Sequence, residues 1–167
     1  MQTYQKLGFE KKESQSIVHA LNQLLANYQL YYHKLRGFHW NVEGRDFFEL
    51  HEKFEEDYQA AHENIDRIAE RIRIFGKKPV YRLAEYLEIA KIKEAKSGLA
   101  PEDMVRQIVD DMETLLGEML GVVQAAEETG DTASIHLIMN MMQALEKRHW
   151  MFSAWLKKVP VASPQHN

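Results

Sequence analysis

The sequence has no cysteine, which excludes disulfides, thiolate metal sites and cysteine nucleophiles. It has only four prolines and no alternating β-branched runs between tight turns, so strands are not expected. No apolar run approaches the roughly 18 residues that a membrane helix needs, and residues 1–15 lack the apolar segment of a signal peptide. These absences favour a helical protein without a membrane span and are compatible with a reducing cytosol.

The chain also lacks the strongly basic balance of dedicated nucleic-acid binders. Lys and Arg number 21 against 25 Asp and Glu, and the net charge is −4 with neutral histidines. This balance, with eight histidines among 167 residues, suits cation handling but equally describes an ordinary acidic surface. The length fits one domain with a sizeable core.

Apolar residues recur at alternating spacings of three and four, which predicts four long amphipathic helices. The second is about 30 residues and roughly 45 Å long, and Asp46 with Glu49 has capping-box spacing at its start. Four such helices with a long connection after the second imply a four-helix bundle. The expected bounds are Ser14 to His39, Asp46 to Phe75, Pro101 to Gly130, and Asp131 or Thr132 to Pro160, with a short extra helix at Arg82 to Ile92.

We therefore expect an all-α fold. No internal repeat or linker divides the chain, so residues 1–167 are predicted to form a single domain. Within it, residues 1–13 are predicted to be a short N-terminal tail and residues 159–167 a short C-terminal tail.

Several polar side chains interrupt the apolar stripes. His39 ends the stripe of the first helix, and His51 lies in the stripe of the second. Glu55 follows His51, and Glu70 follows Asp66, at the one-turn spacing that turns two side chains to the same face. Imidazole and carboxylate donors suit a borderline metal such as iron or zinc.

Each of these residues also has an ordinary structural explanation. A single histidine on an apolar stripe is more often a hydrogen-bonded core residue than a ligand. Asp66 and Glu70 flank Arg67 and Arg71, as on a solvated, salt-bridged face. The coherent spacing of the set favours a metal site over a purely structural helical oligomer.

A carboxylate di-iron site inside the bundle is not expected. Such a site takes one glutamate from each of two helices and a Glu-x-x-His from each of the other two. The first helix has no Asp or Glu between Gln15 and Phe38, and Glu-x-x-His occurs once, at Glu146 to His149.

The spacing of the ligand pairs points to a second copy of the chain. His51 and Asp66 are 15 residues apart, which is roughly 22 Å along one helix, so they cannot bind the same ion within one chain. Two copies packed antiparallel about a two-fold axis would bring His51 of one copy near Asp66 and Glu70 of the other.

Three segments resemble the signature of the Dps miniferritins: FHWNVEG at 38–44, FFELHE at 47–52 and DRIAER at 66–71. The resemblance extends across the chain, including the short extra helix and HWMF at 149–152. It implies a ferritin-like four-helix bundle that assembles as a hollow dodecamer, with ferroxidase sites at the two-fold dimer interfaces.

The resemblance also implies roles for particular residues. His39 and His51 would come from one subunit, and Asp66 and Glu70 from its neighbour, as the catalytic metal ligands. Glu55 stands where the family commonly has aspartate, beside these ligands or among them. Trp40 matches a tryptophan that is thought to quench radicals beside the iron, although its position equally fits a packing residue.

The implied reaction is oxidation of Fe(II), preferentially by hydrogen peroxide rather than oxygen, followed by storage of ferric mineral. Such a ferroxidase protects the cell from oxidative stress, and zinc can substitute for iron at its site. The resemblance implies a cytoplasmic location. Iron pores of the family lie near the start of the last helix and are usually lined by acids; Asp131 remains there, but His136 occupies a position that is often aspartate.

Some members of the family bind DNA through lysine-rich tails. Here Lys6, Lys11 and Lys12 are offset by Glu10 and Glu13. Because affinity scales with the number of phosphates neutralised, we expect weak or no DNA binding. A nucleoid-associated, DNA-compacting protein with secondary iron chemistry is the alternative.

Overall fold

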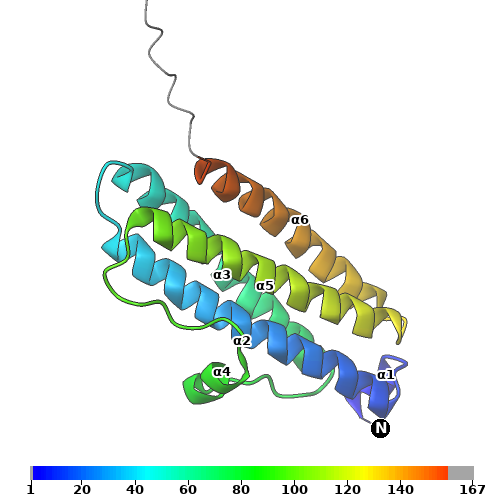
Figure 1. Cartoon of the computed structure of the whole chain (residues 1–167). Helices are drawn as coiled ribbons and strands as arrows, with labels where there is room; N and C mark the ends of the chain where they lie inside the picture. The colour runs from blue at the N-terminus through cyan, green and yellow to red at the C-terminus, as the bar shows by residue number, and fades with distance from the viewer. Residues whose placement is uncertain (1, 158–167) are drawn as a thin grey trace, which may run out of the picture.

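The computed structural model describes residues 2–157, and these residues form six helices and no strand. Figure 1 shows the four long helices lying alongside one another, with α4 outside the bundle next to α2. The predicted all-α bundle with a short extra helix is confirmed; the C-terminal tail predicted at 159–167 lies outside the described residues. The helices are α1 (Thr3–Lys6), α2 (Lys11–Asn41), α3 (Phe47–Ile74), α4 (Leu83–Ile89), α5 (Pro101–Glu127) and α6 (Thr132–Trp155).

The N-terminal segment is more ordered than predicted. Tyr4 in α1 is buried, and the ring of Phe9 packs against Phe75 with centroids 5.3 Å apart. α2 begins at Lys11, where the Glu13 carboxylate accepts a 2.6 Å hydrogen bond from the Glu10 backbone N–H. Tyr4 and Phe9 therefore anchor this segment to the bundle, and helix covers residues 3–6 and 11–13 of the predicted tail.

The ends of α3 lie close to the predicted bounds but are formed differently. Asp46 occupies the N-cap position without a side-chain cap hydrogen bond, so the predicted capping box with Glu49 is not formed. At the other end Gly76 has φ +73°, and the N–H of Lys77 bonds the carbonyl of Ile72 at 3.4 Å. A Cβ on Gly76 would lie 2.7 Å from the hydroxyl oxygen of Thr3, so glycine also permits the packing of α1.

Two buried or half-buried asparagines of α2 fix the long connection between α3 and α5. The side-chain oxygen of Asn22 accepts the N–H of Val80 at 2.9 Å. That of Asn27 accepts the N–H groups of Lys91 and Ile92 at 2.9 and 3.0 Å. Because these N–H groups bond Asn27, α4 ends at Ile89 and does not continue to Ile92 as predicted.

Ion pairs join the helices across the interior. Lys34 of α2 pairs with Asp111 of α5 at 2.6 Å. Arg148 of α6 pairs with two acids of α3, Glu56 at 2.6 Å and Asp57 at 2.5 Å. Asp57 is only 4% exposed, so its charge depends on Arg148 for compensation.

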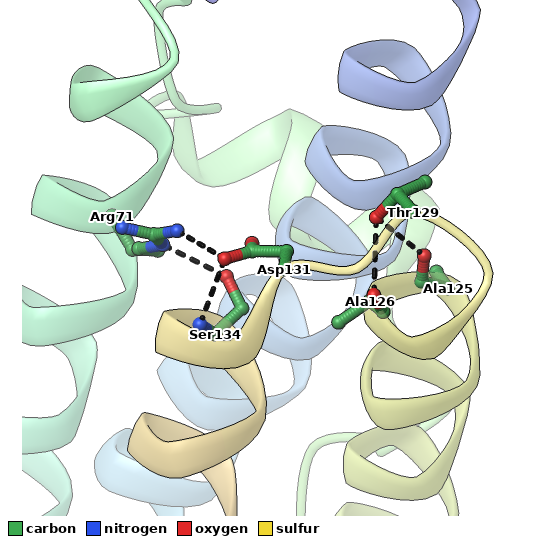
Figure 2. A network of polar contacts seen from close by, with 6 residues as sticks. All are labelled: Arg71, Ala125, Ala126, Thr129, Asp131 and Ser134. Atoms are coloured by element: carbon green, nitrogen blue, oxygen red, sulfur yellow. Dashed lines mark hydrogen bonds and ion pairs between the residues drawn. The ribbon is translucent and has the colours of Figure 1, made fainter. Parts of the chain in front are cut away.

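A third ion pair joins α3 to the start of α6 (Figure 2). Arg71 donates to Asp131 Oδ1 at 2.6 Å and to the hydroxyl of Ser134 at 2.8 Å. The Ser134 N–H donates to Asp131 Oδ1 at 3.1 Å, so Asp131, rather than Thr132, is the N-cap of α6. In the preceding turn the Thr129 hydroxyl donates to the carbonyls of Ala125 and Ala126, each at 3.1 Å.

This network changes the expectation for the iron pore. Burial by itself would raise the pKa of Asp131, but the hydrogen bonds from Arg71 and Ser134 outweigh burial and hold it below its usual value. The side chain is 2% exposed. Asp131 is therefore bound within its own chain and does not provide the free pore acid that the resemblance suggested, whereas His136 is exposed.

The two interior aspartates should make stability fall as the pH rises from about 4 to about 6. Burial raises the pKa of Asp57 and of Asp111 to about 6, although the paired Arg148 and Lys34 lower it. An unfolded aspartate titrates near about 3.9, so between these values only the folded chain keeps the proton. Each carboxyl then lowers the free energy of unfolding by at most about 1.4 kcal/mol per pH unit.

Asp111→Asn is therefore expected to flatten this dependence on pH. Glu94→Gln, at an exposed acid in the connection, is the control and should leave the dependence unchanged. Urea unfolding at fixed protein concentration, repeated from pH 4 to pH 7, measures the effect. If the stability of Asp111→Asn depends on pH as that of wild type does, Asp111 is not a source of the dependence.

Candidate metal centre

His39 and His51 face each other where α2 ends and α3 begins. Their rings stack with centroids 3.8 Å apart and planes 22° from parallel. The Nδ1 of His39 lies 2.8 Å from the carbonyl oxygen of His51, and the Nδ1 of His51 lies 2.8 Å from the carbonyl oxygen of His39. The two histidines therefore tie the helix ends together by reciprocal hydrogen bonds.

These bonds fix the tautomer of both rings. A carbonyl oxygen can only accept, so each Nδ1 must carry the proton and donate it. In a neutral imidazole the Nε2 then keeps its lone pair, which is the form that binds a metal. Among residues 2–157 neither Nε2 takes part in a hydrogen bond. A histidine with a purely structural role in the core would be expected to have both ring nitrogens bonded.

Glu55 adds a carboxylate to the two imidazoles. Ligand atoms of His39, His51 and Glu55 all lie within 4.8 Å of one another, the one such group of three within residues 2–157. The Tyr58 hydroxyl donates to Glu55 Oε1 at 3.1 Å, and the Gln59 amide donates to the same oxygen at 3.4 Å. Burial, then the bond to Glu55, raises the pKa of Tyr58, which keeps the phenol protonated as a donor.

The structure does not bring Asp66 and Glu70 to this cluster. Both lie farther along the continuous helix α3, so His51 and Asp66 are separated by roughly 22 Å. Both acids are exposed, and neither makes an ion pair within the described part of the chain. The neighbouring Arg71 pairs with Asp131 instead, so Asp66 and Glu70 are not held in the salt-bridged face considered above.

The bundle interior holds no comparable group among the described residues. Its buried carboxylates, Asp57 and Asp111, are paired with Arg148 and Lys34. A cation placed between them would meet positive side chains.

Two large aromatic side chains close in sequence to His39 and His51 are exposed. Phe48 is 84% exposed and Trp40 is 64% exposed. The guanidinium of Arg36 lies over the Trp40 ring, 4.7 Å from its centroid, and also over Tyr32. Exposed aromatic side chains that lie together can mark a face that another protein covers.

Sequence reasoning missed Tyr58 as a neighbour of the candidate centre. Its ring packs edge-on against His39 with centroids 5.3 Å apart, while its hydroxyl reaches Glu55. The available signal was the three-residue spacing from Glu55 to Tyr58, which puts both on one helix face.

Similarity to known proteins identifies the family of this chain. Residues 18–161 match the family model of the ferritin-like domain. The chain is 40% identical to DNA protection during starvation protein 2 of Bacillus anthracis over 145 residues, which cover 87% of this chain and 99% of that protein. The chain belongs to the Dps family of ferritin-like proteins. The predicted family is thereby confirmed.

Two further Dps proteins extend the similarity. The DNA protection during starvation protein of Brevibacillus brevis is 43% identical over 137 residues, covering 82% of this chain and 92% of that one. The crystal structure of the Vibrio cholerae Dps protein, described as a ferritin-like diiron-carboxylate protein, has a TM-score of 0.86 and 40% identity. It covers 89% of this chain and 94% of that chain. Membership of the Dps family supports an iron-storage function.

Proposed function

We propose that the chain is a ferroxidase that oxidises Fe(II) at sites shared between two subunits and stores the ferric product. The observation that carries the proposal is the half-built centre. Two imidazoles and one carboxylate of a single chain offer ligand atoms within 4.8 Å of one another. Asp66 and Glu70 lie exposed and out of reach, farther along α3.

An antiparallel dimer completes this centre. If a two-fold axis crosses α3 near its middle, at Tyr58 and Gln59, His51 of one copy lies opposite Asp66 of the other. Two equivalent centres result, each with nitrogen donors from one copy and oxygen donors from its partner. Covering the exposed Trp40 and Phe48 between the two copies would also remove apolar surface from water.

The ligand set suits a substrate that changes oxidation state. Imidazole and carboxylate together bind Fe(II), and the added carboxylates favour the harder Fe(III) product. Two Fe(II) ions each give one electron to hydrogen peroxide, the O–O bond breaks, and two protons complete two water molecules. Passing both electrons together avoids the hydroxyl radical, and Trp40 beside the centre would quench any radical that forms.

Stoichiometry tests the proposal. Wild-type protein is expected to oxidise two Fe(II) per hydrogen peroxide and to do so faster with peroxide than with oxygen. His51→Ala should reduce the rate to near that of the protein-free reaction, because it removes one of the two nitrogen ligands. Stopped-flow absorbance measures the stoichiometry and the rates. A spin trap shows whether hydroxyl radical is released. Equal rates in wild type and His51→Ala would show that this centre does not oxidise Fe(II).

The finer features of the proposal follow from the family. We infer a hollow dodecamer with ferric mineral inside it, a cytoplasmic location, and zinc as an ion that can occupy the same ligands. Residues 1–167 are taken as one domain. Within residues 2–157 no helix is long and apolar enough to span a membrane.

DNA compaction is the weaker candidate. Relatives carry DNA protection in their names, but the lysines of the N-terminal segment do not lie on a free arm. Lys6 ends α1, Lys11 and Lys12 begin α2, and the Tyr4 side chain between them and the N-terminus is buried. A packed segment that alternates basic and acidic residues neutralises few phosphates.

A further inference from the structure

Tyr58 contacts two of the three side chains of the candidate centre. Its hydroxyl donates to Glu55 Oε1 at 3.1 Å, and its ring forms a T-shaped contact with His39, with centroids 5.3 Å apart and planes 76° from parallel. Tyr32 in turn packs edge-on against Tyr58 at 6.2 Å. The Tyr58 ring is therefore packed against two other rings, those of His39 and Tyr32, and its hydroxyl is positioned to donate to Glu55.

Among the residues that the structure describes, only one of the two carboxylate oxygens of Glu55 accepts hydrogen bonds from side chains. The donors from Tyr58 and Gln59 both go to Oε1, which leaves Oε2 as the oxygen for a cation. The histidines show the same division, because each Nδ1 is bonded to a carbonyl and each Nε2 is left for the ion. All three donor groups are thus anchored through one atom and open at another.

We propose that Tyr58 is a positioning residue that holds Glu55 in the orientation needed to bind the substrate iron. The inference rests on the proposed function and adds a residue to it. A glutamate has three side-chain torsions, and freezing them opposes binding. With Tyr58 in place, that ordering is complete before the ion arrives, and a carboxylate oxygen of Glu55 already lies within 4.8 Å of a ring nitrogen of each histidine.

Cobalt(II) titration of the assembled protein tests this role. The titration is run without peroxide, so that no oxidation accompanies binding, and the visible absorption of Co(II) reports the number and kind of its ligands. Tyr58→Phe removes one oxygen and keeps the ring packing against His39 and Tyr32. We expect Co(II) to bind roughly tenfold more weakly, equivalent to about 1.4 kcal/mol, with a spectrum shifted toward that of Glu55→Gln. The KM for Fe(II) should rise more than kcat falls.

Tyr32→Phe is the matched control, because it removes a hydroxyl from the ring that packs next to Tyr58. It is expected to leave the Co(II) affinity and spectrum as in wild type. Thermal unfolding of the metal-free proteins should be the same for both variants, which separates positioning from a general loss of structure.

A double-mutant cycle shows whether Tyr58 acts through Glu55. In a Glu55→Gln background, Tyr58→Phe should weaken Co(II) binding no further. Wild-type affinity in Tyr58→Phe, or an equal loss with and without Glu55, would overturn the inference while leaving the centre intact. If wild type and His51→Ala bind Co(II) equally, the proposed centre does not bind the metal. This result differs from the two outcomes that would overturn the role of Tyr58 alone.

Discussion

Mixed oligomers of two inactive variants, His51→Ala and Asp66→Ala, are expected to regain Fe(II) oxidation. Each variant alone should lose more than about 100-fold in rate, since removing groups that only support a metal ligand already costs about 10–100-fold. In a mixed dimer one centre loses both residues and the other keeps both. With random pairing, half of the dimers are mixed and half of their centres are intact, so about a quarter of wild-type activity should return.

The matched control mixes His39→Ala with His51→Ala. Both changes fall on the same side of the proposed centre, so every centre in the mixed dimer lacks one imidazole and no activity should return. Co-expression with two different tags isolates the mixed assemblies, and peroxide-dependent Fe(II) oxidation measures them. If tagged assemblies that contain both His51→Ala and Asp66→Ala chains stay inactive, the centre is not shared between copies.

Arg148→Ala is expected to lower the free energy of unfolding by about 3–5 kcal/mol at neutral pH. The guanidinium bonds Asp57 at 2.5 Å and Glu56 at 2.6 Å. Without it the Asp57 carboxylate, 4% exposed, is left charged in a poorly solvated site. Because burial already raises its pKa to about 6, Asp57 should take up a proton more readily in the variant. The loss of stability should therefore be smaller at pH 5 than at pH 8.

Arg106→Ala provides the comparison, since Arg106 pairs with Glu102 at 3.0 Å on an exposed face. Surface pairs contribute about 0–1 kcal/mol, so this variant should unfold close to wild type. Replacing Arg148 and Asp57 together by leucine should recover much of the stability, because neither charge then remains buried. Urea denaturation at fixed subunit concentration measures all three. If Arg106→Ala and Arg148→Ala lower the free energy of unfolding equally, burial of the Arg148–Asp57 pair does not account for the loss.

The helices could be predicted because their signals are local. Apolar spacing, Pro101 at the start of α5 and Gly76 after α3 depend only on neighbouring residues. The N-terminal segment could not be predicted in this way, because Tyr4 and Phe9 are ordered by Phe75 and Lys77, far along the chain. The end of α4 depends likewise on Asn27 in another helix.

The candidate centre was predictable only in part. The spacing of His39, His51, Asp66 and Glu70 identified the residues and separated them into two groups. It could not show that each histidine binds the carbonyl of the other, because that bond depends on the turn between α2 and α3. Nor could it show that Asp131 is held by Arg71, 60 residues away, since long-range pairing leaves no trace in local spacing.

The reciprocal bonds between His39 and His51 have a consequence for the order in which the centre is built. They close the corner between α2 and α3, so folding of one subunit already fixes both imidazoles in their metal-binding tautomer. On the proposed dimer, the oxygen ligands arrive only when a second subunit docks. A newly made subunit would then be folded but unable to oxidise iron, and the chemistry would begin with assembly, when a shell is forming to hold the product.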